Sequence, residues 1–203
     1  MMKQRTYSFC NFFYFLISIL TVILLHSCSQ TTKQNEKMLS IMTVIQGYMM
    51  SFETNIRMRA QNEGVQMNDV IVESVENKEH NIRELLPTPK IILRYSFSGC
   101  ATCIFDELEL LRNDDRIDMN NVYVLLAGAN LRMLKIFSQQ HNSGSQVLLC
   151  NNLPIPFDNV GKMYVFVLDS TLVVHDFFIP NNSAPNLSKW YYDAIYEKYF
   201  TTN

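Results

Sequence analysis

The sequence lacks a strong charge of either sign. Its 203 residues include 17 lysines and arginines and 19 aspartates and glutamates, so the formal net charge is only −2. Proteins that bind nucleic acids usually carry a basic domain or a clustered basic patch, so we expect no nucleic-acid partner. Apolar residues make up 48% of the chain, which is sufficient for a globular core.

The chain also lacks the short motifs of several enzyme and metal-binding classes. It contains no G-x-S-x-G, no H-E-x-x-H and no phosphate loop, so nothing supports a hydrolase. A tetrahedral structural zinc site needs four ligands, and neither a second C-x-x-C nor a paired histidine is there to supply them. Internal repeats and low-complexity tracts are absent too.

What the sequence does contain is one C-x-x-C motif between a predicted strand and a predicted helix. Residues 91–97 are β-branched and aromatic, Ser98-Gly99 ends that run, and residues 104–111 have apolar positions at helical spacing. Cys100 is therefore expected at the helix N-terminus, where unpaired N–H groups and the macrodipole favour a thiolate. Cys103 lies one turn further on, close enough to form a disulfide. The motif predicts a redox couple with an exposed attacking sulfur and a more buried resolving one.

The N-terminus has the layout of a secretory signal peptide. Lys3 and Arg5 precede an apolar run over residues 12–25. The following Leu25-His26-Ser27-Cys28 resembles a bacterial lipobox, in which Cys28 is lipidated and becomes the mature N-terminus. The alternative is an uncleaved membrane anchor, because the run is only slightly shorter than the ~20 residues of a spanning helix.

Both interpretations place the rest of the chain in an oxidising envelope compartment, where disulfide chemistry is possible. Ser29-Gln30 is not an inner-membrane retention signal of the Asp type. We therefore expect a lipid-anchored, periplasm-facing protein, with the outer membrane favoured. The predicted segments are the signal peptide 1–27, a polar tether 28–37, a helical extension 38–64 and a main domain 65–203.

The helical extension shows apolar residues at three- and four-residue steps, which predicts an amphipathic helix whose apolar face packs on the core. The predicted face is Met38, Ile41, Met42, Ile45, Tyr48, Met49, Phe52 and Ile56. Five methionines permit a second interpretation, a metal-binding or adaptable binding surface, because thioethers are soft and flexible. These are Met38, Met42, Met49, Met50 and Met58.

The order of elements in residues 65–203 resembles the thioredoxin fold. A strand at 69–75, a helical turn at 82–86 and a strand at 90–97 lead into the C-x-x-C helix. The chain then continues as a strand at 121–129, a helix from 131 to about 141, a short strand at 146–150, a hairpin of 163–168 with 172–179, and a helix at 184–200. The extra strand is typical of the TlpA-like and peroxiredoxin-like branches. The resemblance implies a three-layer α/β sandwich around a mixed sheet.

Three positions depart from the family pattern. Ser98-Gly99 stands where thioredoxins usually have a tryptophan, and Met163 stands where they have a cis-proline. A non-proline cis bond costs about 3 kcal/mol, so we expect a trans peptide at Met163. Arg94 occupies the place of the family's buried acid. It either lowers a thiol pKa or, as we favour, forms a structural salt bridge with Glu107 or Glu73.

The resemblance implies a membrane-anchored thiol-disulfide oxidoreductase in which Cys100 attacks and Cys103 resolves, with Gly99 and Thr102 in supporting roles. Ala101-Thr102 supplies no positive charge, so a reducing protein is the default. Its partners would be a protein or small-molecule disulfide and an upstream electron donor, and no cofactor is implied. The alternatives are a thioredoxin-fold binding module without redox activity and a copper-handling protein that uses Cys100, Cys103 and His175. Cys150, in a predicted buried strand, is expected to be a core residue rather than a third redox thiol.

Overall fold

The computed structural model describes residues 35–97, 101–140, 145–158 and 162–201. The predicted signal peptide 1–27, the predicted lipidation site Cys28, and residues 98–100, which include Gly99 and Cys100, therefore lie outside the described residues. The chain divides into two units, Met1–Gln46 and Gly47–Asn203, and the division falls within the N-terminal helix, described over residues 35–62. This helix already includes residues 35–37, which the sequence assigned to the tether.

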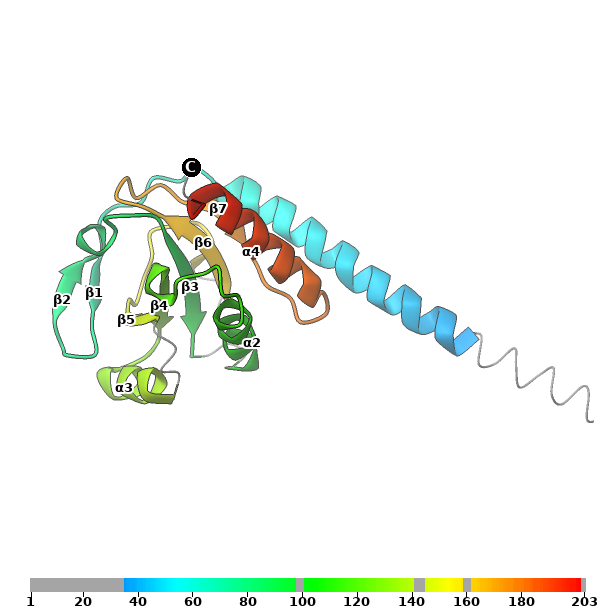
Figure 1. Ribbon diagram of the computed structural model, residues 1–203, viewed down its shortest axis with the longest axis horizontal. Helices are drawn as coiled ribbons and strands as arrows, with labels where there is room; N and C mark the ends of the chain where they lie inside the picture. Colours follow the sequence, from blue (N-terminus) through cyan, green and yellow to red (C-terminus); the bar gives the residue numbers. More distant parts are fainter. Residues whose placement is uncertain (1–34, 98–100, 141–144, 159–161, 202–203) are drawn as a thin grey trace, which may run out of the picture. The chain divides into compact units, whose positions relative to one another are not determined.

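The second unit contains a seven-stranded mixed sheet with the strand order β2-β1-β5-β4-β3-β6-β7 (Figure 1). β3 is parallel to β4, and β4 is parallel to β5, whereas the remaining neighbours are antiparallel. The strands are β1 (Ile71–Glu73), β2 (Glu79–Asn81), β3 (Lys90–Ser96), β4 (Val122–Ala127), β5 (Gln146–Leu149), β6 (Tyr164–Leu168) and β7 (His175–Phe178). The named helices are η1 (Ile82–Leu85), α2 (Ala101–Arg112), η2 (Met119–Asn121), α3 (Leu131–Gln140) and α4 (Pro185–Tyr199).

Helices α2, α3 and α4 pack on one face of the sheet. The successive crossovers β3-α2-β4 and β4-α3-β5 step in the same direction along the sheet, and right-handed crossovers then place both helices on the same side. The cluster on this face joins alternate strand residues to residues of all three helices. Its members include Ile91, Leu93, Val122, Val124, Val165, Ile104, Leu108, Leu134, Phe137, Tyr192 and Ile195.

The opposite face is covered by η1, by the connections around the strands, and by the end of the N-terminal helix. The strand residues that alternate with the first set point to this side, as the two-residue period of a β-strand requires. The cluster includes Ile92, Leu125, Phe166, Ile82, Leu153, Phe157 and Leu172, with Met58 of the N-terminal helix packed against it. A parallel βαβ core, the antiparallel β6–β7 pair and a closing helix make this a thioredoxin-like fold.

The predicted packing of the N-terminal helix is wrong. In the second unit, Met49, Phe52 and Ile56 are 68%, 61% and 55% exposed. The side of the helix that meets the domain is mostly polar instead. Ser51 and Asn62 are buried there, hydrogen bonds hold Asn55, and Met58 is the apolar residue that packs against the core. In the first unit, Met38, Ile41, Met42 and Ile45 are exposed as well. Among the described residues, no helix has the length and hydropathy required to cross a bilayer.

The closing helix α4 has Pro185 in its first turn, a position that suits proline because its fixed φ is helical and the N–H it lacks would be unpaired there. Its buried residues are Ser188, Tyr192 and Ile195. Trp190, on the same helix, is 60% exposed. On the buried side of this helix, the hydroxyl groups of Ser188 and Tyr192 donate to the Glu107 carboxylate of α2.

Candidate functional site

Cys103 lies in the first turn of α2, which follows directly after the central strand β3. It is disulfide-bonded. The other described cysteine, Cys150, is free, so the partner of Cys103 lies outside the described residues. The pairing with Cys100 stays a prediction, and so does the role of Gly99. Thr102 is exposed on the same turn.

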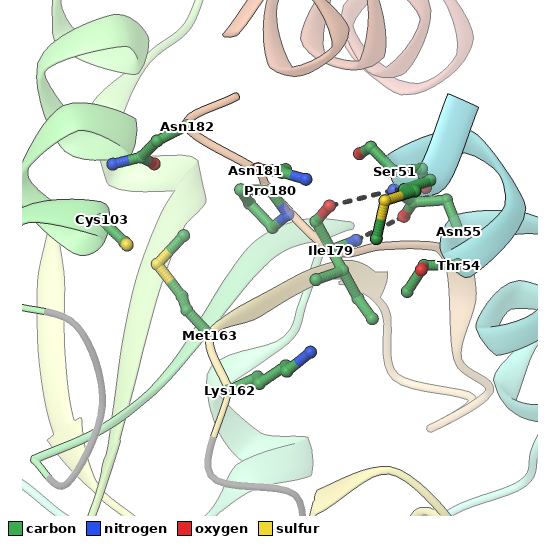
Figure 2. Close-up of a pocket in the computed structure, with 11 residues that line it drawn as sticks. Ser51, Thr54, Asn55, Cys103, Lys162, Met163, Ile179, Pro180, Asn181 and Asn182 are labelled. Atoms are coloured by element: carbon green, nitrogen blue, oxygen red, sulfur yellow. Dashed lines mark hydrogen bonds between the residues drawn. The ribbon is translucent and has the colours of Figure 1, made fainter. Parts of the chain in front are cut away.

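A cavity of about 540 Å³ lies beside Cys103 within the second unit. Figure 2 shows Cys103 and Met163 on one side of it and Ser51, Thr54 and Asn55 of the N-terminal helix on the other. We call this cavity the Cys103 cleft. Its described lining residues are Met50, Ser51, Thr54, Asn55, Cys103, Lys162, Met163, Ile179, Pro180, Asn181 and Asn182.

Met163 lies on the same side of the Cys103 cleft as Cys103 (Figure 2). It precedes β6, is 8% exposed and lines the Cys103 cleft. No peptide bond in the described part of the chain is cis, which confirms the trans geometry expected for the Lys162–Met163 bond. The backbone at Met163 therefore differs from that of a cis-proline loop.

Two side-chain bridges hold the walls of the Cys103 cleft together. The Asn55 amide nitrogen donates to the Ile179 carbonyl at 3.0 Å, and the Ile179 N–H donates to Asn55 Oδ1 at 2.6 Å. On the far side, Asn182 Nδ2 donates to Asp106 Oδ2 of α2 at 3.3 Å. The segment after β7 is thus tied to the N-terminal helix and to the helix that carries Cys103.

Close packing also brings the N-terminal helix to the start of α4. A Cβ atom at Gly47 would lie 3.3 Å from the Ser183 Cβ, closer than most such contacts. Glycine therefore permits a close approach that a larger residue would widen.

Glu107 is a buried carboxylate one helical turn after Cys103. It is 6% exposed and accepts hydrogen bonds from Ser188 Oγ at 2.7 Å and from the Tyr192 hydroxyl at 2.8 Å. No lysine or arginine in the described residues forms a salt bridge with it. Burial therefore raises the pKa of Glu107, although the two hydroxyl donors partly oppose that shift.

The partner of Arg94 is Asp158, so the predicted salt bridge with Glu107 or Glu73 is wrong. Arg94 Nε donates to Asp158 Oδ1 at 2.7 Å, and Nη2 donates to Oδ2 at 2.9 Å. The reason is strand alternation, because Arg94 alternates with Leu93 and Tyr95, which face α2. Its guanidinium therefore points to the opposite face of the sheet, away from the helix that carries Cys103.

The Arg94–Asp158 pair belongs to a buried polar network. The guanidinium also donates to the carbonyls of Cys150 and Asn151. Asp158 additionally accepts from the Leu153 N–H and the Tyr164 hydroxyl, each at 2.7 Å. The Arg94 and Asp158 side chains are only 3% and 4% exposed. Their charges are therefore satisfied by hydrogen bonds within the protein rather than by water. This geometry gives Arg94 a structural role.

Cys150 follows β5 directly and is 2% exposed within the core. Burial raises the pKa of its thiol, which makes the thiol a poor nucleophile. The structure therefore agrees with the prediction that Cys150 is a core residue.

The copper alternative gains no support from the geometry. His175 begins β7, and its Nδ1 lies 3.9 Å from Glu63 Oε1. It does not appear among the described lining residues of the Cys103 cleft. Within the described segments, no three histidine, cysteine, aspartate or glutamate side chains gather as a metal site would require.

Sequence reasoning missed the contribution of the N-terminal helix to this site. Ser51 and Asn55 are four residues apart and lie on the polar side of the helix, which an amphipathic pattern assigns to solvent. Their spacing was the available signal, since residues four apart share one helix face.

Comparison with known proteins found no matching family model and no matching curated protein. Solved structures with similar chains include a thiol:disulfide interchange protein from Bacteroides sp., with 9% identity and a TM-score of 0.47, covering 70% of this chain and 92% of that one. The peroxidoxin BcpB from Mycobacterium tuberculosis has 14% identity and a TM-score of 0.48, covering 66% and 98%. The thioredoxin domain of a thiol-disulfide oxidoreductase from Bacteroides vulgatus has 11% identity and a TM-score of 0.45, covering 64% and 96%. At these identities the similarity concerns the fold alone.

Proposed function

We propose that this protein is a thiol-disulfide oxidoreductase whose redox couple is Cys100 and Cys103. One observation carries the proposal: Cys103 is disulfide-bonded in the first turn of α2 and lines an open cleft. A purely structural disulfide needs no adjoining cavity, whereas an exchanging one must admit a second sulfur-bearing molecule.

The proposed reaction is a two-step exchange. The Cys100 thiolate attacks a substrate disulfide, which forms a mixed disulfide and releases one substrate thiolate. Cys103 then loses its proton and attacks the Cys100 sulfur, so the second substrate thiolate leaves and both thiolates take up protons. The substrate gains two electrons, and the protein couple becomes a disulfide that an upstream dithiol donor must reduce.

The sequence around the couple favours the reducing direction. Neither Ala101 nor Thr102 offers a positive charge to stabilise a thiolate strongly, and strong thiolate stabilisation is what makes such couples oxidising. Arg94 lies on the other face of the sheet and bonds Asp158, so it supplies no such charge either.

Trapping variants test this assignment. Cys103→Ser should accumulate covalent complexes with disulfide substrates, because the mixed disulfide can no longer be resolved, while Cys100→Ser should not. A thiol-alkylation gel shift across a series of redox buffers should show one two-electron transition in the wild type. Equal trapping by both variants would reverse the roles of the two cysteines, and the lack of any transition would exclude the activity.

We also propose that the mature protein is anchored in the cell envelope by lipid on Cys28 and faces the periplasm, with the outer membrane favoured. The lipobox-like sequence supports this location. Metabolic labelling with a fatty-acid analogue should modify the wild type but not Cys28→Ala. Labelling of both, or of neither, would contradict the anchor.

A binding module without redox activity is the second candidate. The trans peptide bond before Met163 favours it, because the family's cis-proline clamp is missing. In that case the cysteines would remain oxidised in every buffer of the gel-shift series, while a partner would still bind.

A further inference from the structure

The described part of the first unit is a helical segment covered with exposed apolar side chains. It comprises residues 35–46, the beginning of the N-terminal helix (blue in Figure 1). Its large apolar residues are between 49% and 67% exposed: Met38, Leu39, Ile41, Met42, Val44 and Ile45. A contiguous apolar surface of this kind marks an interaction site.

These side chains occupy most of the circumference of the segment, and no charge interrupts them. Residues 38–46 contain no aspartate, glutamate, lysine or arginine. The polar residues Ser40, Thr43 and Gln46 recur every three positions and therefore lie along one side. A coiled-coil seam is a narrower apolar stripe flanked by charged residues that select the partner helix. The segment lacks those flanking charges, so its surface does not fit a second copy of the helix.

The hydroxyl groups on the polar side are satisfied within the helix itself. Ser40 Oγ donates to the Lys37 carbonyl at 2.8 Å, and Thr43 Oγ1 donates to the Leu39 carbonyl at 3.0 Å. Hydroxyl groups that bond their own helix keep these hydrogen bonds where water is scarce. The polar side therefore tolerates the boundary between the headgroups and the acyl chains of a bilayer.

The place of the segment in the chain brings it close to a membrane. In the proposed anchor, Cys28 carries lipid, and the described helix begins seven residues later, at residue 35. Even a fully extended chain covers only about 25 Å over that number of residues. The start of the helix therefore lies within this distance of the residue that is attached to the bilayer.

We propose that residues 35–46 form an interfacial helix that lies on the membrane surface. Ile41 and Ile45 enter the boundary of the acyl chains, and Ser40 and Thr43 face the headgroups and water. A lipid surface accepts a broad, uncharged apolar face, and it does not require the shape complementarity of a protein partner. The inference rests on the proposed lipid anchor, which brings the segment to the bilayer.

Tryptophan fluorescence locates the segment relative to the acyl chains. The full chain is reconstituted in phosphatidylcholine vesicles with Trp190→Phe, which removes its only native tryptophan. The indole of Ile45→Trp should emit at shorter wavelength than in water and should lose most of its emission when the acyl chains carry bromine, a contact quencher. Thr43→Trp, on the polar side, is the matched control and should lose little.

Three results would overturn the proposal. A shifted indole at position 45 that bromine does not quench would mean that a second copy covers this face. An unshifted indole would mean that the face stays in water. Equal quenching at positions 43 and 45 would mean that the segment is inserted into the bilayer and does not lie on its surface.

Charged variants measure the contribution of the helix without the lipid. The mature chain, residues 28–203 with Cys28→Ala, is sedimented with phosphatidylcholine vesicles. Ile41→Glu combined with Ile45→Glu should lower its partition coefficient about tenfold or more, because two side chains that enter the lipid become charged. Ser40→Glu combined with Thr43→Glu adds the same charge on the polar side and should have a smaller effect. Equal losses, or no binding by the parent chain, would contradict the inference.

Fatty-acid labelling separates this inference from the anchor on which it rests. If labelling at Cys28 fails while bromine still quenches the indole at position 45, the lipid anchor fails and the membrane contact of the helix stands. If labelling succeeds while the indole stays in water, lipid alone holds the protein and the inference is wrong.

Discussion

The Asn55 side chain pairs with the backbone of Ile179 as a neighbouring strand would. Its amide nitrogen donates to the Ile179 carbonyl at 3.0 Å, and its oxygen accepts the Ile179 N–H at 2.6 Å. Ile179 directly follows β7, the edge strand of the sheet. One side chain therefore pairs the backbone groups that follow the edge strand and attaches the N-terminal helix to the domain.

Asn55→Ala should destabilise the second unit. It leaves the Ile179 N–H and carbonyl without their partner, and we expect a loss of about 1–3 kcal/mol in the free energy of unfolding. Urea denaturation measures it. Gln61→Ala, at an exposed position of the same helix, is the matched control, and equal stability of both variants would show that the Asn55 bridge contributes nothing.

Asp158→Asn should be among the most damaging polar substitutions. It leaves the Arg94 guanidinium buried without a counter-charge, which costs about 3–5 kcal/mol. Chemical denaturation of the variant and the wild type at neutral pH gives the difference. Arg57→Ala, which removes an exposed ion pair with Glu53, should have a much smaller effect, and a similar loss in both variants would refute the buried-pair argument.

Glu107 should make stability depend on pH in the weakly acidic range. Burial raises the pKa of Glu107 above its value in the unfolded chain. The contribution of Glu107 to the free energy of unfolding is therefore favourable below about pH 4.3, and this contribution is lost as the pH rises through the folded pKa. Glu107→Gln should therefore be more stable than the wild type at pH 7, by about 1.4 kcal/mol for each unit of pKa elevation.

Measurements of Tm from pH 3 to 8 test this sign. The advantage of Glu107→Gln should vanish at the acid end, where the wild-type carboxyl is also neutral. Glu109→Gln, at an exposed position of the same helix, should show no such trend. A constant advantage at every pH would mean that the carboxylate charge is not its cause.

Asp176 should give the opposite pH dependence. Burial opposes its charge, but hydrogen bonds from Lys198 and Tyr199, at 2.7 and 2.6 Å, hold the pKa of Asp176 below its usual value. The stabilisation is therefore present above about pH 3.9 and disappears as the pH falls through the folded pKa.

Asp176→Asn should lower the Tm at pH 7, and the difference from the wild type should shrink below about pH 3.9. The backbone at Asp176 has a φ of 51°, and asparagine tolerates this left-handed conformation as well as aspartate does. The variant thus removes the charge without adding backbone strain. A difference that persists unchanged in acid would assign the effect to packing.

The sequence located the elements whose apolar pattern is strong. The strand predicted at 90–97 is observed as Lys90–Ser96, and the closing helix predicted at 184–200 is observed as Pro185–Tyr199. The short strand β2, Glu79–Asn81, was missed because its polar residues carry no alternation and its pairing comes from β1. Such a strand forms because it pairs with a neighbouring strand, not because its own residues have a high β-propensity.

The sequence by itself determined the strand-to-helix junction at the C-x-x-C motif, the order of elements and the trans bond expected at Met163, because these depend on local periodicity and backbone chemistry. Only the tertiary structure decided which charges meet and which helix face packs. Because side chains alternate along β3, Arg94 faces away from Glu107 and pairs with Asp158 on the other side of the sheet. Hydrogen bonds from Asn55 to Ile179 docked the N-terminal helix by its polar side, since a periodic pattern identifies an apolar face but not the surface that contacts it.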